Sequence, residues 1–347
     1  MKSNYSNKTI LVTGGGGYIG THVTERLLNE GYNVRIFDQF MFGENAISTL
    51  KKNKNLTVIK GEIGEWQKLR ESLNGVDAVI HLAGLVGDPA CIVNKELTIQ
   101  MNIVSTRIVK ELSKDAKVSR FIFSSSCSVY GASDELMSEE SKLNPVSLYA
   151  QTKIDSENEI LNDDSKNFHP TILRFATVFG HSQRQRFDLV ANLFVAQAYN
   201  DGVITVTGSS QWRPFIHPQD IAEAIVKVLE KPEKEVSGQI INVGDDNLNI
   251  TIGDLALLVA DIVKKDRNGK PVEIILNDDV KDVRNYRVSF KKINKLLGFK
   301  ASVDIKKGLE EIYDNFKKGE YQKDYKNPLY INVEMTRLLQ MKLSLIK

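Results

Sequence analysis

The sequence predicts an α/β protein with a doubly wound parallel sheet and a smaller α/β lobe interleaved toward the C-terminal end. Three observations indicate this fold class. Short apolar runs alternate with amphipathic stretches through the first half of the 347 residues, which is the order of strands and helices in βαβ units. This alternation becomes irregular after about residue 175. The composition, 41% hydrophobic and 26% charged, is that of an ordinary globular protein and excludes disordered, collagen-like and coiled-coil classes.

The strands of the main sheet are predicted from apolar runs that are continuous rather than alternating. The first, at residues 9–13, has the pattern of a strand that helices cover on both faces. Crossovers between parallel strands are right-handed, so the intervening helices are expected on the two faces of the sheet. Further strands are predicted at residues 33–37, 56–59, 78–81, 120–124 and 171–174, and helices between them at 18–29, 65–73, 100–112 and 147–161.

The second half of the chain divides less regularly. Residues 1–175, with 215–245 returning to them, are assigned to a nucleotide-binding domain of the Rossmann type, and 176–214 with 246–320 to a substrate lobe. The tail, 321–347, has no predicted role. The elements expected here are helices at 188–200, 220–229, 252–264 and 305–317, a strand at 239–243, and a tail segment at 333–345 that suits either a docked helix or a partner contact.

Charge and cysteine content restrict the binding partners and the cellular compartment that the sequence predicts. Lys+Arg 46 against Asp+Glu 44 leaves a net charge of +2, which gives no electrostatic signal for nucleic acid. Cys91 and Cys127 are too few for a disulfide framework and suit a reducing compartment. The polar start and the lack of a run of about 18 apolar residues predict a cytoplasmic protein without a membrane span.

A glycine-rich loop directly follows the first predicted strand. Gly14, Gly17 and Gly20 stand in the segment TGGGGYIG at residues 13–20, just before a predicted helix. Such a loop permits a tight turn, lets the backbone approach a pyrophosphate and points a helix N-terminus at the anion. Asp38 ends the second predicted strand 18 residues after Gly20, close to the spacing of the acid that binds a cofactor ribose. A carboxylate there accepts both ribose hydroxyls and repels a 2′-phosphate, which favours NAD over NADP.

A Tyr–Lys pair and a serine-rich strand end indicate redox chemistry. Tyr149 and Lys153 are four residues apart and so share one helix face. A tyrosine is a weak base at neutral pH, but a nearby ammonium and an oxidised nicotinamide both favour the phenolate and lower its pKa. Ser126, after the fifth predicted strand, is placed to hydrogen-bond the reacting oxygen.

On these motifs the chain resembles the extended short-chain dehydrogenase/reductase family, the NAD-dependent nucleotide-sugar epimerases and dehydratases. The resemblance covers roughly residues 8–315. Members use NAD to oxidise a sugar hydroxyl, commonly at C4, to a keto sugar that is epimerised, dehydrated, reduced or released. The matching segments are TGGGGYIG (13–20), Asp38, GEI (61–63), HLAG (81–84), Asn102, SSSCSVYG (124–131), YAQTK (149–153) and RPFIHPQDIA (213–222).

The resemblance implies a role for each matching position. Tyr149 is the expected base, Lys153 is expected to bind the nicotinamide ribose, and Ser126 to orient the sugar oxygen. Arg213 matches a substrate diphosphate-binding arginine, and Arg284 lies near a second such position. The cofactor-binding residues implied are Gly14, Gly17, Tyr18, Ile19, Gly20, Asp38, Glu62, Ile63, Leu82, Ala83, Gly84, Asn102, Ser124 and Lys153, and the substrate-binding residues are Thr177, Arg186, Arg213 and Arg284.

Departures from the family pattern bear on the reaction. The 4,6-dehydratases carry an acid just after the catalytic Ser or Thr, whereas Cys127 and Ser128 stand here, so dehydration lacks its acid/base group. Some 3,5-epimerases use a Cys and a His, but Cys127 is one position out of register with theirs and suits packing better. Thr177 replaces a usual Asn in the substrate cleft, and the basic segment 183–187 is either a ligand contact or an exposed loop.

The leading hypothesis is an NAD-dependent enzyme that oxidises a nucleotide-diphosphate sugar, as a 4-epimerase or a 4-dehydrogenase. The alternatives are an NDP-keto-sugar reductase, a 3,5-epimerase, and a non-catalytic NAD-binding regulator on the same fold. No metal site is predicted, because the five His show no ligand spacing with Cys or acids. The resemblance also implies a homodimer through the helices at 100–112 and 147–161, with the tail able to add contacts toward a tetramer.

Overall fold

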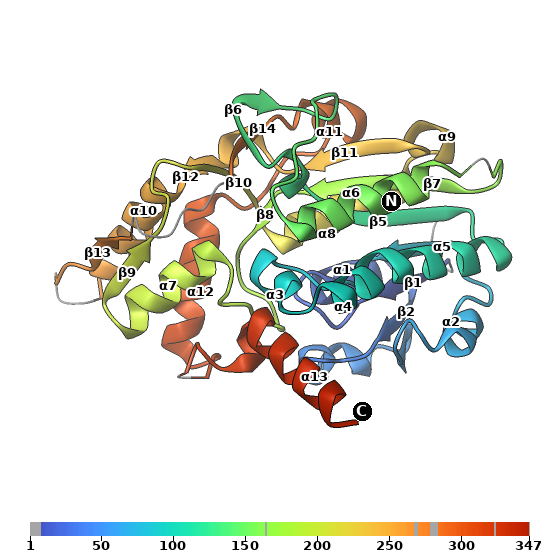
Figure 1. Ribbon diagram of the computed structural model, residues 1–347, viewed down its shortest axis with the longest axis horizontal. Helices are drawn as coiled ribbons and strands as arrows, with labels where there is room; N and C mark the ends of the chain where they lie inside the picture. The colour runs from blue at the N-terminus through green and yellow to red at the C-terminus, as the bar shows by residue number, and fades with distance from the viewer. Residues whose placement is uncertain (1–7, 164, 267–269, 278–283, 323, 347) are drawn as a thin grey trace.

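The centre of the molecule is a parallel sheet of seven strands (Figure 1). The structure is a computed structural model that describes residues 8–163, 165–266, 270–277, 284–322 and 324–346. The strand order, β11-β7-β5-β4-β1-β2-β3, runs outward from β1 in both directions, so the sheet is doubly wound as predicted. The strands are β1 (Thr9–Thr13), β2 (Asn33–Asp38), β3 (Leu56–Lys60), β4 (Ala78–His81), β5 (Arg120–Ser126), β7 (His169–Phe175) and β11 (Gln239–Val243).

Each face of the sheet is covered by its own apolar core. Alternate residues of the strands point to opposite faces, so Val12 and Ile80 enter one core while Leu11 and Val79 enter the other. The first core is closed by α1 (Gly20–Asn29), α8 (Pro218–Glu230) and α11 (Lys291–Leu297), and the second by α2 (Trp66–Ser72), α5 (Ser105–Asp115) and α6 (Leu148–Leu161). This two-sided burial explains why the strands read as continuous apolar runs.

The smaller lobe has a separate core, which Figure 1 shows beyond the carboxyl ends of the central strands. Aromatic rings dominate part of it: Phe187 lies 5.1 Å from Phe316 and 5.0 Å from Tyr330, centroid to centroid. Its helices are α7 (Val190–Asn200), α10 (Ile252–Lys264) and α12 (Ile305–Lys318), whereas the short α9 (Glu233–Val236) packs at the edge of the central sheet. The short strands pair as β9 (Val203–Val206) with β13 (Glu273–Leu276), β10 (Trp212–Ile216) with β8 (Thr177–Val178) and β12 (Asn249–Thr251), and β6 (Ala132–Met137) with β14 (Asn285–Val288).

The tail forms a helix that docks onto the chain. Its last segment, α13 (Asn332–Ile346), lies against α3 (Asp88–Val93), with α4 (Lys95–Ile99) following α3 in the chain. Val333 packs against the small apolar cluster formed around Leu85 and Cys91. Of the two interpretations of the tail, the docked helix is therefore the one present in the structure.

One predicted helix is irregular. The pattern at residues 100–112 predicts a continuous helix, but Gln100–Val104 forms a π-helical turn between α4 and α5. Asn102 lies in this turn. Its side-chain oxygen accepts a hydrogen bond from the N–H of Leu85 at 2.7 Å, and its Nδ2 donates to the carbonyl oxygen of Leu85 at 2.9 Å. The widened turn thus fixes the segment after β4 in place. Among the described residues, no helix has the length and apolarity needed to span a membrane.

Candidate active site

A cleft of about 590 Å³ opens at the carboxyl ends of the central strands, between the sheet and the smaller lobe. Ligand sites in doubly wound sheets occur at this place, where the strand order reverses between β1 and β4. The predicted site residues that line it are Gly14, Gly17, Tyr18, Ile19, Gly20, Asp38, Glu62, Ile63, Leu82, Ala83, Gly84, Ser124, Ser126, Tyr149, Lys153, Thr177, Arg186 and Arg284.

The glycine loop needs its glycines for close backbone packing. Gly14 has φ +73°, and a Cβ there would lie 2.8 Å from the backbone nitrogen of Ala83. A Cβ on Gly20 would lie 2.1 Å from the carbonyl oxygen of Gly14, so any side chain there would displace the loop. The helix that follows, α1, starts without a side-chain cap. No side chain therefore covers the start of the helix, where the helix dipole favours an anion.

Asp38 is fixed at the end of β2 by backbone donors. Its carboxylate accepts hydrogen bonds from the N–H groups of Gly16 at 2.9 Å and Phe40 at 2.7 Å. Burial raises the pKa of Asp38 above its ordinary value, although these two hydrogen bonds oppose the shift. The carboxylate lines the cleft beside the glycine loop, which is the position predicted for a ribose contact.

Ser126, Tyr149 and Lys153 converge in the same cleft. Ser126 ends β5, and Tyr149 and Lys153 lie one turn apart on α6. The ammonium of Lys153 donates to the carbonyl oxygen of Ser124 at 2.7 Å and lies 5.8 Å from the centre of the Tyr149 ring. The Ser126 side chain is close enough to the Tyr149 hydroxyl to favour the phenolate. The structure thus brings together all three residues that the sequence proposed for catalysis.

The prediction of a lowered tyrosine pKa does not hold for the chain by itself. Burial raises the pKa of Tyr149 above its ordinary value, and this outweighs the opposing effects of Ser126 and of Arg186. Burial also lowers the pKa of Lys153 to about 8. The lowered pKa was predicted from two positive charges near Tyr149. The chain supplies one of them, the ammonium of Lys153, and the other is the charge of an oxidised nicotinamide.

Two of the predicted site residues lie behind the cleft wall rather than on it. Asn102 is buried and, besides Leu85, bonds the hydroxyl of Thr152 at 3.1 Å. Arg213 is also buried; its guanidinium donates to the carbonyl oxygen of Arg284 at 2.6 Å and lies 5.4 Å from the Tyr286 ring. Both residues therefore position a segment that lines the cleft. A direct contact of Arg213 with a diphosphate stays a prediction.

The predicted substrate end of the cleft carries two ion-paired arginines. Arg186 forms a two-pronged pair with Asp188, at 2.9 and 3.0 Å. Arg284 pairs with Asp88 at 3.1 Å, and Asp88 also accepts from the Ser147 hydroxyl at 2.7 Å. Neighbouring guanidinium groups of this kind are suited to phosphate oxygens.

Cys127 faces away from the cleft. Its thiol is fully buried and donates to the carbonyl oxygen of Arg174 at 3.3 Å. Burial raises the pKa of this thiol, so the reactive thiolate is disfavoured. The interpretation of Cys127 as a packing residue agrees with this geometry.

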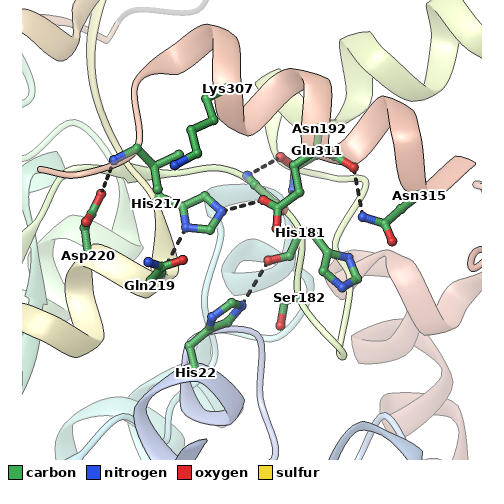
Figure 2. A network of polar contacts seen from close by, with 12 residues as sticks. His22, His181, Ser182, Asn192, His217, Gln219, Asp220, Lys307, Glu311 and Asn315 are labelled. Atoms are coloured by element: carbon green, nitrogen blue, oxygen red, sulfur yellow. Dashed lines mark hydrogen bonds and ion pairs between the residues drawn. The ribbon is translucent and has the colours of Figure 1, made fainter. Parts of the chain in front are cut away.

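The loop that carries Arg184 and Arg186 is anchored between the two lobes by a network of polar contacts (Figure 2). His22 on α1 donates from Nε2 to the carbonyl oxygen of His181 at 3.0 Å. His217, at the start of α8, donates to Glu311 of α12 at 2.9 Å. His22 thus ties the start of the loop to the glycine-loop helix, and the His217–Glu311 contact joins α8 to the smaller lobe.

The cleft-lining residues that sequence reasoning missed include Phe42, Asp88, Asn332 and Leu339. Arg184, in the basic segment 183–187, was foreseen only as part of a possible ligand contact, and it also lines the cleft. The unusual basic character of that segment was the signal for it. Asn332 and Leu339 belong to the tail, where no motif indicated a site. Among the described residues, no cluster of three or more His, Cys, Asp or Glu has the arrangement of a metal site.

The fold and the Ser–Tyr–Lys arrangement define the extended short-chain dehydrogenase/reductase class. Within it, the chain belongs to the NAD dependent epimerase/dehydratase family, whose profile matches residues 10–244. The chain is therefore an NAD-dependent enzyme.

The alignments with named relatives cover most of the chain. A UDP-glucuronate 4-epimerase of Thermodesulfobacterium geofontis is 28% identical over 313 residues, covering 86% of this chain and 93% of that protein. A human dTDP-D-glucose 4,6-dehydratase is 25% identical over 324 residues, covering 90% and 91%. Among solved structures, the UDP-glucuronic acid 4-epimerase from Bacillus cereus in complex with UDP-glucuronic acid and NAD gives a TM-score of 0.79 at 28% identity, covering 89% of this chain and 99% of that one.

The residues of the cleft fit NAD. The uncapped start of α1 and the crowded glycines provide a cradle for a pyrophosphate that a Cβ would fill. Asp38 stands at the adenosine end of the cleft, while Tyr149 and Lys153 stand at the other. Glu62, Ile63, Leu82, Ala83 and Gly84 line the cleft as their proposed cofactor roles require.

Proposed function

We propose that the protein oxidises a hydroxyl of a nucleotide-diphosphate sugar, at C4, and acts as a 4-epimerase or a 4-dehydrogenase. The observation that carries this proposal is the convergence of Ser126, Tyr149 and Lys153 beside the glycine loop in one cleft. The relatives named above act on UDP- and dTDP-linked sugars, which supports the substrate class. The same proposal places the enzyme in cytoplasmic carbohydrate biosynthesis.

The chain's own residues account for the movement of the proton. Tyr149, as the phenolate, accepts the proton of the sugar hydroxyl, and Ser126 hydrogen-bonds the oxygen on which a carbonyl forms. Lys153 holds the nicotinamide ribose and keeps positive charge near the phenolate. When bound, NAD takes up the hydride that leaves the sugar carbon. In an epimerase Tyr149 would then return the proton to the sugar oxygen.

The opposite end of the cleft supports recognition of a diphosphate. Arg186, Arg284 and Thr177 all line the cleft, and Arg186 acts electrostatically on Tyr149. Because Arg284 is already paired with Asp88, a substrate phosphate has to compete with or join this pair. The positions that hold an acid in 4,6-dehydratases carry Cys127 and Ser128, which argues against dehydration.

The replacement Tyr149→Phe tests the proposal. It is expected to lower turnover roughly 100- to 10,000-fold while NAD still binds, because only the proton-transfer group is lost. The assay incubates purified protein with a panel of UDP-, dTDP- and GDP-hexoses and identifies products by NMR. Unchanged turnover by Tyr149→Phe refutes the assignment of the base. Failure of every sugar to be oxidised or inverted refutes the proposed function.

The same incubations separate the two reactions and the alternatives. A 4-epimerase yields the inverted sugar with no net NADH, and a 4-dehydrogenase yields one NADH for each keto sugar. A keto-sugar reductase is active only when NADH and a keto sugar are supplied. A regulator binds NAD without turnover, although such a protein has no need for Ser126, Tyr149 and Lys153 together. A 3,5-epimerase is disfavoured by the burial of Cys127 away from the cleft.

We also propose a homodimer built on the surface of α5 and α6. Three exposed apolar side chains lie near these helices: Ile92 is 61% exposed, Ile99 41% and Val146 36%. A shared interface buries such groups in pairs. Size-exclusion chromatography with light scattering measures the mass directly, and a monomer at micromolar concentration refutes this part of the proposal.

A further inference from the structure

Arg184 is a buried cation that lines the cleft, and no carboxylate of the described residues forms an ion pair with it. The side chain is only 5% exposed. In the part of the chain that the structure describes, its guanidinium donates from Nη2 to Oδ1 of Asn332 at 2.7 Å and stacks on the ring of Phe42, 3.4 Å from the centroid. Its Nε is buried and has no hydrogen-bond partner among the residues that the structure describes. A buried guanidinium without a direct counter-ion destabilises the folded state unless a bound anion pairs with it.

The carboxylates near Arg184, those of Asp188 and Asp38, are already hydrogen-bonded to other groups. The nearest ion pair is that of Arg186 with Asp188, in which both carboxylate oxygens of Asp188 are engaged. The second guanidinium therefore adds repulsion rather than relief. Burial, together with this repulsion from Arg186, lowers the pKa of Arg184 to about 9. Asp188 and Asp38 therefore favour the charged guanidinium only through space, and the repulsion and burial outweigh them.

The position of Arg184 identifies which anion the site lacks. Phe42, on which it stacks, follows β2 and the ribose-binding acid Asp38, and Arg184 also acts electrostatically on Asp38 and Tyr18. These groups surround the glycine loop, at the cofactor end of the cleft. Arg284, the predicted contact for the substrate diphosphate, lines the cleft with Asp88 and Tyr286 instead. A phosphate group near Arg184 therefore belongs to the dinucleotide.

The C-terminal helix holds Arg184 in this place. Asn332, the first residue of α13, accepts from Arg184 and donates from Nδ2 to the carbonyl oxygen of Val86 at 3.1 Å. Its backbone N–H donates to Asp188 at 3.1 Å. Thr336, one turn further on, is fully buried, and Leu339 also lines the cleft. The helix is thus tied both to the basic loop and to the segment after β4.

We propose that Arg184 pairs with the pyrophosphate of bound NAD, and that α13 holds it there through Asn332, so that the tail retains the cofactor. Arg184 lies within residues 10–244, which the family profile matches, whereas Asn332 and the rest of α13 lie outside them. Retention suits a reaction cycle that regenerates NAD in place, and it hinders one that must release NADH after each turnover. The inference concerns cofactor binding and does not depend on the identity of the sugar.

Binding measurements on the full chain, stripped of nucleotide, test the pairing. The probes are NAD, ADP-ribose, which keeps the pyrophosphate, and adenosine, which lacks it. We expect Arg184→Gln to weaken NAD and ADP-ribose roughly 10- to 100-fold, the size of a lost charged hydrogen bond, and to leave adenosine unchanged. Arg184→Lys keeps the charge and should lose less. Arg70→Gln, an exposed arginine on α2, is the matched control and should change nothing.

The tail is tested by the rate at which NAD dissociates from the loaded protein. Asn332→Ala, and a chain ending at Ile331, are both expected to release NAD faster. In the double variant with Arg184→Gln, Asn332→Ala should add little, because it acts through the arginine. Circular dichroism confirms folding, and Asn332→Ala and Arg184→Lys serve where Arg184→Gln fails to fold.

Three outcomes overturn the proposal. Equal losses for adenosine and ADP-ribose assign Arg184 a purely structural role. Unchanged NAD affinity with weakened UDP-glucose binding assigns it to the substrate. An unchanged NAD dissociation rate in both tail variants refutes retention by α13. Absence of sugar turnover by the unaltered chain contradicts only the proposed function, since none of these measurements uses a sugar to define cofactor binding.

Discussion

The buried ion pair between Glu157 and Arg174 gives a prediction whose size follows from the structure. Glu157 on α6 and Arg174 on β7 form two contacts, Nη2–Oε2 at 2.6 Å and Nε–Oε1 at 2.9 Å, and each side chain is 3% exposed. Ser125 at the end of β5 also donates to Glu157. Arg174 in turn donates to the Tyr130 hydroxyl at 3.1 Å. The pair therefore joins α6, which carries Tyr149 and Lys153, to the sheet.

The replacement Glu157→Gln keeps the shape of the side chain and removes its charge. Arg174 then stays buried without a counter-ion, which costs about 3–5 kcal/mol in the free energy of unfolding. An unfolding entropy of about 2.1 cal/mol/K per residue gives roughly 0.7 kcal/mol/K for this chain length. The two figures together predict a fall in Tm of about 4–7 °C.

Thermal unfolding followed by circular dichroism measures this change. The control is Glu71→Gln, which removes an exposed carboxylate on α2 and should leave Tm nearly unchanged. A double variant, Glu157→Leu with Arg174→Met, removes both charges and should recover part of the loss. If the Tm of Glu157→Gln equals that of Glu71→Gln, the ion pair does not stabilise the fold and the reasoning from its burial is wrong.

Three further predictions concern pH and the glycine loop. Because burial lowers the pKa of Lys153 to about 8, we expect kcat to fall as the pH rises through 8; a constant kcat up to pH 10 contradicts a role for the ammonium. Burial lowers the pKa of His22 to about 4 and of His81 to about 3, below the value of 6.5 in the unfolded chain. As the pH falls below 6.5, protons bind these groups in the unfolded state before they bind in the folded state, so the free energy of unfolding decreases. For His22 alone the loss approaches about 3 kcal/mol at pH 4, and urea unfolding of His22→Gln should show a flatter dependence. Gly20→Ala places a Cβ 2.1 Å from a backbone oxygen of its own loop and should abolish NAD binding by calorimetry, whereas Gly64→Ala, with open space around it, should not.

The central sheet could be predicted because each of its strands is marked by a short apolar run, and this pattern recurs along the chain. A strand covered on both faces has to be apolar along its whole length, and the run at Gln239–Val243 indicated β11 with its observed bounds. The glycine loop, Asp38 and the Tyr149–Lys153 pair are likewise short motifs whose chemistry depends on spacing along the chain.

What the sequence did not reveal depends on contacts between distant segments. β13 is a run of only four residues, three of them apolar, yet it is largely exposed, and its one strand partner is β9, about seventy residues earlier. Asn332 has no motif around it, and its contact with Arg184 joins residues 148 positions apart. Arg213 was matched to a diphosphate by its motif, yet the direction of its side chain is set by the carbonyl of Arg284. Such directions follow from packing of the folded chain.

The return of the chain to β11 has a consequence for the order of events during synthesis. β7 ends at Phe175 and its outer neighbour begins only at Gln239, after the segment that builds much of the smaller lobe. At about 5–20 residues per second, ribosomes take roughly 3–13 s to make the intervening stretch. Throughout that time β7 is an open, apolar sheet edge, the kind of surface on which chains aggregate or chaperones bind. Proteolysis of nascent chains halted before and after Val243 should detect the moment at which this edge closes.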